Sequence, residues 1–335
     1  MKKNLMTLGV LALFVLMAYG QEKKFALYSV AFYNMENLFD TIHDEGKNDY
    51  EYLPNGTNQW NTMKYKAKLK NMSEILSLLS TDKLPMGPAI IGVSEIENYR
   101  VLEDILKQPA LADRGYQYVH YEGEDQRGVD CAFFYNPKLF ELTNSKLVPY
   151  VYINDTIHKT RGFLIASGNI AGEKMHFIVN HWPSRAAASP ARERAGEQVR
   201  AIKDSLLRED SAAKIVIMGD MNDDPMDKSM AVALGAKRKP ADVGPTDLYN
   251  PWWDTLKKGY GTLMYKGKWN LFDQIVFTGN LLGTDRSTLK FYKHEIFRRD
   301  FMFQKEGKYK GYPKRTQAGG VWLNGYSDHL PTIIY

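Results

Sequence analysis

Apolar, β-branched and aromatic residues recur along the chain in short runs, with turn-forming residues between them. The runs are LYSVAFYN, AIIGVSEI, YQYVHYEG, DCAFFYN, GFLIASGNI, KMHFIVNHW, KIVIMGDMN, LFDQIVFT and LPTIIY. Runs of about four to eight such residues, bounded by turn signals, are typical of β-strands. We therefore expect a strand at each run, with boundaries defined only to within a few residues.

Helical periodicity occurs between some of these runs. Met72, Ile75, Leu76 and Leu79 lie on one face of a helix expected over residues 60–80, and a second helix is expected over residues 190–207. The pattern is therefore mixed α/β. No internal repeat and no long Pro/Gly/Ser-rich linker divides the sequence, so we expect residues 21–335 to form one domain.

The first twenty residues differ from the rest of the chain. Lys2 and Lys3 precede an apolar run over residues 5–17, and small residues follow up to Gly20. This order is typical of a secretory signal peptide. The run is also shorter than the roughly 20 residues that span a bilayer. We therefore expect cleavage near Gly20 and export to the periplasm or the medium.

Charge and composition narrow the function only a little. The formal net charge of +5 falls to +3 without Lys2 and Lys3, which permits an anionic partner without requiring one. The single cysteine, Cys131, lies in an apolar run and is expected to be a buried, unreactive thiol. Three polar segments, over residues 41–62, 223–268 and 300–324, have the length of binding loops. The last of these segments is basic, through Lys305, Lys308, Lys310, Lys314 and Arg315, which fits either a solvated surface or a phosphate-contacting loop.

Several of the apolar runs end in side chains that can bind a cation or transfer a proton. These side chains are Asn34, Glu36, Glu95, His181, Asp220, Asn222, Asp273, Asp328 and His329. Any one of these residues is also typical of a turn, and so is the segment GDMNDDP, residues 219–225, which contains Asp220 and Asn222. Strands packed side by side, however, bring their ends to one rim of a sheet, where α/β proteins usually bind ligands.

Carboxylates that converge on one rim repel each other, and a divalent cation would relieve that repulsion. The candidate ligands are oxygens of Asp, Glu and Asn, and the sequence has no paired-histidine spacing of the zinc type. This favours Mg²⁺, with Mn²⁺ or Ca²⁺ as alternatives, over zinc.

Seven motifs together carry a resemblance to a known family. YNMENLFD, GVSEIEN, RGVDCAFFY, VNHWPSR, MGDMNDDP, LFDQIVF and YSDHLP occur in the order and approximate spacing of the endonuclease/exonuclease/phosphatase family, which includes pancreatic-type deoxyribonucleases. The resemblance extends from about Val30 to the C-terminus. It implies an α/β fold in which two β-sheets form a sandwich flanked by helices. It also implies metal-dependent hydrolysis of a phosphate ester.

The resemblance also implies roles for the metal-binding side chains. Glu95 resembles the family's main metal-binding carboxylate, and Asn34 resembles the asparagine that supports the metal and phosphate. Asp328 is expected beside the metal. Glu36 stands where some relatives have an aspartate ligand.

The remaining positions resemble the family's catalytic residues. His329 resembles the general base, with Asp273 orienting its ring, and His181 resembles the histidine that stabilises the phosphoryl oxygens. Asp220 and Asn222 match an Asp-x-Asn pair, whose aspartate either activates water or assists the leaving group. Two further side chains, Arg127 and Arg185, are either phosphate contacts or exposed surface arginines.

Three functions remain open at this point. The favoured hypothesis is an exported nuclease that hydrolyses phosphodiester bonds of DNA or RNA, acting as a monomer without an obligate protein partner. The alternative is a phosphatase or phospholipase C of the same fold that acts on a phosphoinositide, sphingomyelin or a small phosphate ester. A non-catalytic polyanion-binding module comes last, because every expected catalytic position carries a competent residue.

Overall fold

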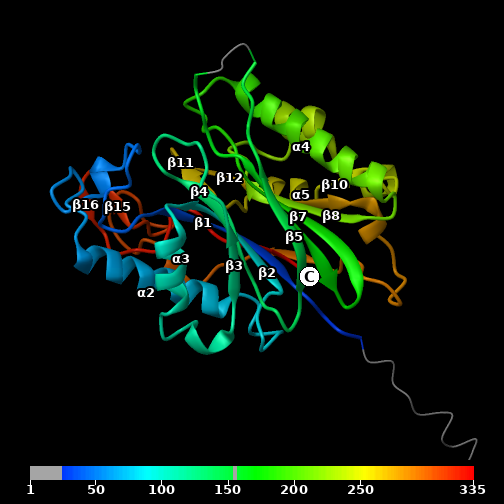
Figure 1. Ribbon diagram of the computed structural model, residues 1–335, viewed down its shortest axis with the longest axis horizontal. Helices are drawn as coiled ribbons and strands as arrows, with labels where there is room; N and C mark the ends of the chain where they lie inside the picture. Colours follow the sequence, from blue (N-terminus) through cyan, green and yellow to red (C-terminus); the bar gives the residue numbers. More distant parts are fainter. Residues whose placement is uncertain (1–24, 154–156) are drawn as a thin grey trace, which may run out of the picture.

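Two mixed β-sheets packed face to face form the centre of the protein (Figure 1). The computed structural model describes residues 25–153 and 157–335, so the expected signal peptide lies outside the described residues. The first sheet has six strands, in the order β14 (His294–Ile296), β17 (Thr332–Ile334), β1 (Val30–Leu38), β2 (Ile90–Ile96), β4 (Asp130–Tyr135) and β3 (Gln117–His120). The second has seven, in the order β5 (Glu141–Val148), β6 (Phe163–Ile170), β7 (Glu173–His181), β8 (Lys214–Asp220), β13 (Asp273–Thr278), β10 (Leu248–Tyr249) and β9 (Ala236–Lys237).

Helices and short hairpins complete the fold. The helices are α2 (Thr62–Leu78), α3 (Tyr99–Leu106), α4 (Ser189–Glu209) and α5 (Trp253–Lys257). The hairpins pair β11 (Leu263–Tyr265) with β12 (Lys268–Asn270), and β15 (Gln317–Ala318) with β16 (Val321–Trp322). Short helical turns occur at Tyr50–Tyr52, Ala112–Arg114, Ser229–Leu234, Pro240–Asp242, Gly279–Leu281 and Asp300–Met302. In the described part of the chain, no helix combines the length and the apolar composition needed to cross a membrane.

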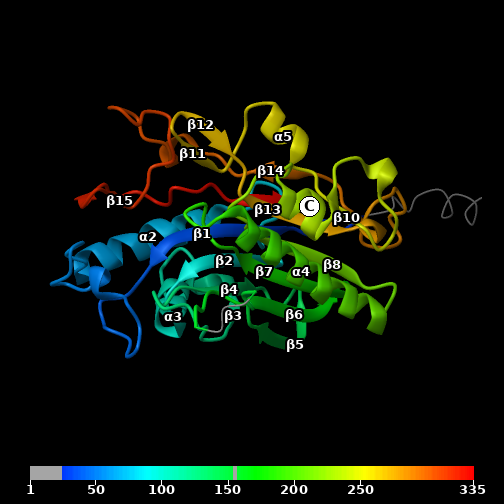
Figure 2. The same cartoon turned by 90° about the horizontal axis from the view of Figure 1, so that it is seen from above.

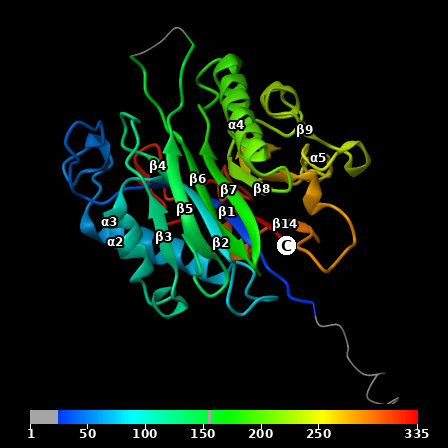
Figure 3. The same cartoon turned by 45° about the vertical axis from the view of Figure 1, so that its right-hand side comes forward.

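Three apolar clusters hold the layers together. Phe32, Phe133 and Phe177 belong to the cluster between the two sheets. A second cluster packs α2 and α3 on the outer face of the six-stranded sheet, and a third packs α4 on the outer face of the seven-stranded sheet. Figure 3 shows α2 and α3 on one side of the strands and α4 on the other. The expected two-sheet sandwich flanked by helices is therefore confirmed.

Each expected strand is present, and burial explains why the sequence revealed it. The strand β8 is buried at all its positions, and a strand covered on both faces reads as a continuous apolar run. Both expected helices also form, as α2 and α4. The sequence did not predict β5, whose residues are mostly exposed or half-exposed at the edge of its sheet, because its polar side chains interrupt the apolar pattern. The short helix α3 was also missed.

The order of the strands determines where the functional side chains meet. In the six-stranded sheet, β1 and β2 run parallel to each other. In the seven-stranded sheet, β7 and β8 run parallel and β13 runs antiparallel to β8. The ends of β1, β2, β7 and β8 and the start of β13 therefore lie at one rim of the sandwich. Figure 2 shows the β11–β12 hairpin and the orange segment that follows β14 on the same side of the molecule.

Candidate active site

Three neighbouring strands of the seven-stranded sheet place three of the expected residues in one row. His181 ends β7 and lies opposite Asp220, which ends β8. Asp220 in turn lies opposite Asp273, the first residue of β13. All three side chains are buried. A row of adjacent strand ends therefore brings together residues that are up to 92 positions apart in the sequence.

The six-stranded sheet contributes Asn34 and Glu95 to the same rim. The Asn34 amide donates to Glu95 Oε1 (3.1 Å) and to Asp220 Oδ2 (3.0 Å), so one side chain connects the two sheets. The register of β2 against β4 shifts between Ser94 and Ile96, which leaves Glu95 at a bulge. Bulges beside active sites re-aim a side chain. Here the backbone N–H of Asn37 donates to Glu95 Oε2 (3.0 Å) and holds the re-aimed carboxylate.

The backbone at this rim is strained. Glu36, Asn37, Glu95 and Asn222 have φ angles of 47°, 53°, 58° and 51°. A non-glycine residue in the left-handed region costs about 1–3 kcal/mol, and such residues cluster at functional sites. The surrounding contacts maintain this strain, since Asn34 Oδ1 accepts from Glu36 N (2.8 Å) and Asp220 Oδ1 accepts from Asn222 N (2.9 Å).

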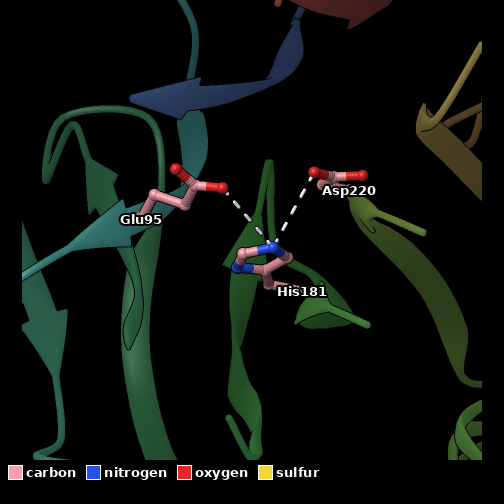
Figure 4. Close-up of side chains that lie close together, drawn as sticks. All are labelled: Glu95, His181 and Asp220. Carbon is pink, nitrogen blue, oxygen red and sulfur yellow. Dashed lines mark ion pairs between the residues drawn. The ribbon is translucent and has the colours of Figure 1, made fainter. Parts of the chain in front are cut away.

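Glu95, His181 and Asp220 form a group that fits a metal ion (Figure 4). His181 Nε2 lies 3.6 Å from Glu95 Oε1 and 3.8 Å from Asp220 Oδ2. One ligand atom from each of the three residues lies within 4.8 Å of the other two. Burial raises the pKa of Asp220 to about 7; the charge of His329 opposes this shift, and the charges of Asp273 and Glu95 add to it. Two carboxylates that repel each other in a buried site fit a hard divalent cation.

His329 and Asp273 form a buried pair beside this group. His329 Nδ1 lies 2.7 Å from Asp273 Oδ2, and its other ring nitrogen, Nε2, lies 3.9 Å from Asp220 Oδ2 and from Asp328 Oδ1. Burial lowers the pKa of His329, but the charges of Asp273 and Asp220 outweigh it and hold the pKa well above its usual range. A carboxylate on Nδ1 fixes the ring tautomer and leaves Nε2 on the side of Asp220, which belongs to the candidate metal group.

The surroundings of His181 favour its neutral form, in contrast to those of His329. Burial, followed by the positive charges of Arg161, Arg127 and His329, lowers the pKa of His181 well below its usual range. Its Nδ1 is a buried atom without a hydrogen-bond partner among the described residues. A neutral imidazole at this position is able to donate a hydrogen bond from one nitrogen.

Glu36 and Asp328 share Arg315 as their cation, and Asp328 also connects this ionic group to His329. Arg315 Nε donates to Glu36 Oε1 (2.8 Å), and Arg315 Nη2 lies 2.9 Å from Asp328 Oδ2. The backbone N–H of Thr316 donates to the other oxygen of Glu36 (2.7 Å). Burial and then the charge of Asp328 raise the pKa of Glu36 to about 7, while the charges of Lys68 and Arg315 lower it. The structure therefore does not bring Glu36 into the group of Glu95, His181 and Asp220, and its expected role as a ligand stays a prediction.

Lys68 is the most informative residue that the sequence analysis missed. Its side chain is fully buried; its Nζ contacts Thr316 Oγ1, donates to Tyr326 O (2.7 Å) and lies 3.8 Å from Glu36. Burial lowers its pKa to about 8. The signal was present in the sequence, because Lys68 stands four residues before Met72 on the face of the helix that was expected to be apolar.

The two candidate phosphate contacts have carboxylate partners in the structure. Arg185 makes ion pairs with Asp223 (3.3 Å), Asp224 (3.2 Å) and Asp227 (2.8 Å). This cluster explains the crowding of aspartates in GDMNDDP, of which only Asp220 enters the site. Arg127 Nε lies 3.5 Å from Asp125, and about half of its side chain is exposed.

A polar cavity of about 180 Å³ opens beside Glu36 and Arg315. Asn37, Glu51 and Asn58 line it together with the β15–β16 hairpin. Its lining offers both hydrogen-bond donors and acceptors next to the candidate metal group. It has the chemistry to receive a small polar group attached to a bound phosphate.

A family model and several solved structures match the chain. The model described as "Endonuclease/Exonuclease/phosphatase family" matches residues 29–335. No curated protein matches the sequence.

Solved structures with the same fold include proteins with different described activities. The mannosyl-6-phosphatase of Bacteroides thetaiotaomicron has a TM-score of 0.57 at 14% identity, covering 92% of this chain and 99% of that one. The TDP2 of D. rerio, solved in complex with a single-strand DNA product, has a TM-score of 0.54 at 14% identity, covering 92% and 97%. The human Nocturnin catalytic domain has a TM-score of 0.52 at 15% identity, covering 92% and 93%. At these identities the likeness shows a common fold.

Proposed function

The chain belongs to the endonuclease/exonuclease/phosphatase family, and from this premise we propose that it is an exported nuclease that hydrolyses phosphodiester bonds of nucleic acids. Membership makes it a metal-dependent phosphoesterase. The substrate, the identity of the metal, the roles of individual residues and the export are parts of our proposal.

One observation carries the proposal, namely the hydrogen-bonded pair of His329 and Asp273 beside the buried carboxylate of Asp220 and the partly buried carboxylate of Glu95. Glu95 and Asp220, supported by Asn34, would hold the divalent cation, which we propose to be Mg²⁺. When bound, the cation polarises the phosphoryl oxygens and stabilises the charge that develops on them. A cation held by Asp220 would offset one of the charges that raise the pKa of His329, and would thereby favour the neutral form that a general base requires.

The side chains of the site then supply the remaining steps of the reaction. His329 Nε2 accepts the proton of the attacking water, while Asp273 holds the tautomer that leaves this nitrogen free. The water oxygen bonds to phosphorus, and the bond between phosphorus and the leaving oxygen breaks, after which that oxygen takes up a proton from solvent water. His181 donates to a phosphoryl oxygen, and a donor aimed at developing charge stabilises the transition state.

The basic segment over residues 300–324 favours a nucleic acid as the substrate. One of the solved structures, TDP2 of D. rerio, is described as bound to single-strand DNA. The expected signal peptide over residues 1–20 supports export, to the periplasm or the medium.

A second candidate function rests on the polar cavity beside Glu36 and Arg315. A volume of about 180 Å³ suits one small polar group better than a polymer. The Bacteroides thetaiotaomicron protein with this fold is a mannosyl-6-phosphatase. A phosphatase that acts on a small polar phosphate ester is therefore the alternative.

Turnover by purified residues 21–335 tests these proposals. The substrates are supercoiled plasmid, bis-p-nitrophenyl phosphate and a sugar 6-phosphate, each with Mg²⁺, Mn²⁺ or chelator. Metal-dependent nicking that is lost in both Asp220→Ala and His329→Ala is the expected result. Release of phosphate from the sugar ester without nicking would replace the nuclease proposal with the phosphatase.

A further inference from the structure

A second cavity, of about 400 Å³, lies in the segment that follows β14. We call it the basic pocket. Its lining comprises Arg298, Arg299, Asp300, Phe303, Gln304, Lys305, Lys310 and Gly311. Four of these side chains are cationic and one is a carboxylate, so an excess of positive charge faces the cavity.

The four cations of the basic pocket make no ion pair within the described part of the chain, although Asp300 also lines the cavity. Within residues 25–153 and 157–335, no carboxylate lies within ion-pair distance of Arg298, Arg299, Lys305 or Lys310. The contrast with Arg315 is direct, because Arg315 is paired with two carboxylates of the site. Unpaired cations gathered around one cavity favour an anionic ligand.

The pocket is also preorganised. The guanidinium of Arg298 lies 4.9 Å from the ring centroids of both Trp269 and Phe303, and 5.7 Å from that of Tyr260. These rings hold the guanidinium in place through cation–π contacts. Its Nη1 is buried and has no hydrogen-bond partner among the described residues.

Backbone hydrogen bonds shape the rest of the pocket. Gln304 N donates to Tyr312 O (2.8 Å), and Gly311 N donates to Gln304 O (2.8 Å). A bridge between Phe303 and Pro313 closes the same loop. These contacts fold residues 303–313 back on themselves, and they place Lys305 and Lys310 on the two arms of one hairpin.

The basic pocket lies at the same rim as the candidate active site. Phe297 N donates to Pro331 O (2.8 Å), so the chain that enters the pocket runs beside the residues that follow His329. The β11–β12 hairpin forms a second connection, because Leu263 bridges to His329 and the same hairpin carries Trp269, which contacts Arg298. From the pocket the chain then reaches Arg315, the partner of Glu36.

We infer that the basic pocket is a second phosphate-binding site, which holds a backbone phosphate of a nucleic-acid substrate away from the reacting phosphodiester. This inference rests on the proposed nuclease function. Lys and Arg contacts to phosphates position a nucleic acid and carry no sequence information. The pocket thus selects polymeric substrates over small esters, and it does so without regard to base sequence.

The test compares two double variants that remove equal charge. Lys305→Gln with Lys310→Gln alters the pocket at exposed positions. Lys66→Gln with Lys70→Gln removes two exposed lysines of α2 and serves as the matched control. Binding of a fluorescein-labelled single-stranded oligonucleotide is measured by anisotropy in chelator, so that the result does not depend on turnover. Turnover of bis-p-nitrophenyl phosphate is measured in parallel with metal.

We expect the pocket variant to bind the oligonucleotide about 5- to 10-fold more weakly at low salt. The slope of log affinity against log salt should fall by about 0.7, the value for one lost phosphate contact on a single strand. Turnover of the small diester should equal that of the control variant.

Equal affinity and equal salt slope in the two double variants would overturn the inference, as would a wild-type protein that does not bind the oligonucleotide. Competition by inorganic phosphate that equals competition by the oligonucleotide at the same phosphate concentration would assign the pocket to small phosphates instead. Failure of the proposed nuclease function is a separate result, since it would appear as absent nicking by the wild-type protein.

Discussion

Replacement of Asp273 by Asn gives the sharpest test of the proposed general base. Asp273 is fully buried, and its Oδ2 lies 2.7 Å from His329 Nδ1. Asn has nearly the same shape but presents either a weaker acceptor or an N–H to this nitrogen. His329 then loses the charge that fixes its tautomer, and Nε2 no longer reliably accepts a proton.

The size of the effect follows from the step that is lost. General acid–base catalysis by a positioned side chain contributes about 10²- to 10⁴-fold. We therefore expect kcat for bis-p-nitrophenyl phosphate to fall by about this factor in Asp273→Asn, which corresponds to about 3–5 kcal/mol of transition-state stabilisation. The assay is release of p-nitrophenolate at saturating substrate and metal.

A matched variant separates this effect from a general change at the rim. Asp224→Asn alters another carboxylate of the same region, which accepts from Leu271 N (2.7 Å) and contacts Arg185 but lies outside the His329 pair. We expect its kcat to stay within a few-fold of the wild type. An Asp273→Asn protein with an unchanged melting temperature and near-normal kcat would refute the assignment of His329 and Asp273 as base and orienting carboxylate.

Four further outcomes are expected. Mg²⁺ should raise the melting temperature of the wild type but not that of Glu95→Gln, because a ligand that binds only the folded state stabilises it; equal shifts in a thermal scan would remove Glu95 from the metal site. Gly219→Ala should destabilise the fold by about 1–3 kcal/mol in urea unfolding, because its Cβ would lie 2.3 Å from a carbonyl oxygen of β7. Lys68→Met should lower the free energy of unfolding by about 3–5 kcal/mol in the same assay, because it leaves the buried carboxylate of Glu36 without this cation. Unchanged urea midpoints in Gly219→Ala and Lys68→Met would contradict the packing described. Burial and then the charge of Lys258 lower the pKa of His294. Protonation of this ring therefore favours the unfolded chain, and the free energy of unfolding should fall as the pH drops through and below the ordinary histidine pKa of about 6.5. Melting temperatures should therefore fall less between neutral and mildly acidic pH in His294→Asn than in the wild type, and parallel curves would exclude this ring as the source.

The sequence predicted the central strands because burial leaves a direct record in residue type. A strand such as β8, covered by α4 on one face and by the other sheet on the opposite face, must be apolar at nearly every position. The edge strand β5 carries no such record, because half of its side chains meet water. Family resemblance was equally visible, since its motifs occur in order along the chain, and the match over residues 29–335 confirms it.

The candidate site was predicted as a set of residue types and not as a geometry. Asp220 and Asp273 could be named from their positions at the ends of apolar runs. Their position opposite each other depends on the pairing of β8 with β13, which local sequence does not encode. The bulge that re-aims Glu95 is likewise a product of register between β2 and β4.

By itself, then, the sequence determined which elements form and which side chains are chemically able to act, because both depend on the properties of single residues and their near neighbours. Only the tertiary structure decided how those side chains are partnered. It placed Glu36 and Asp328 with Arg315, and among the described residues it left the cations around Arg298 without a carboxylate at ion-pair distance. The physical reason is that the electrostatic energy of a charged side chain depends mainly on the groups within a few ångströms of it. Those neighbouring groups come from distant parts of the chain.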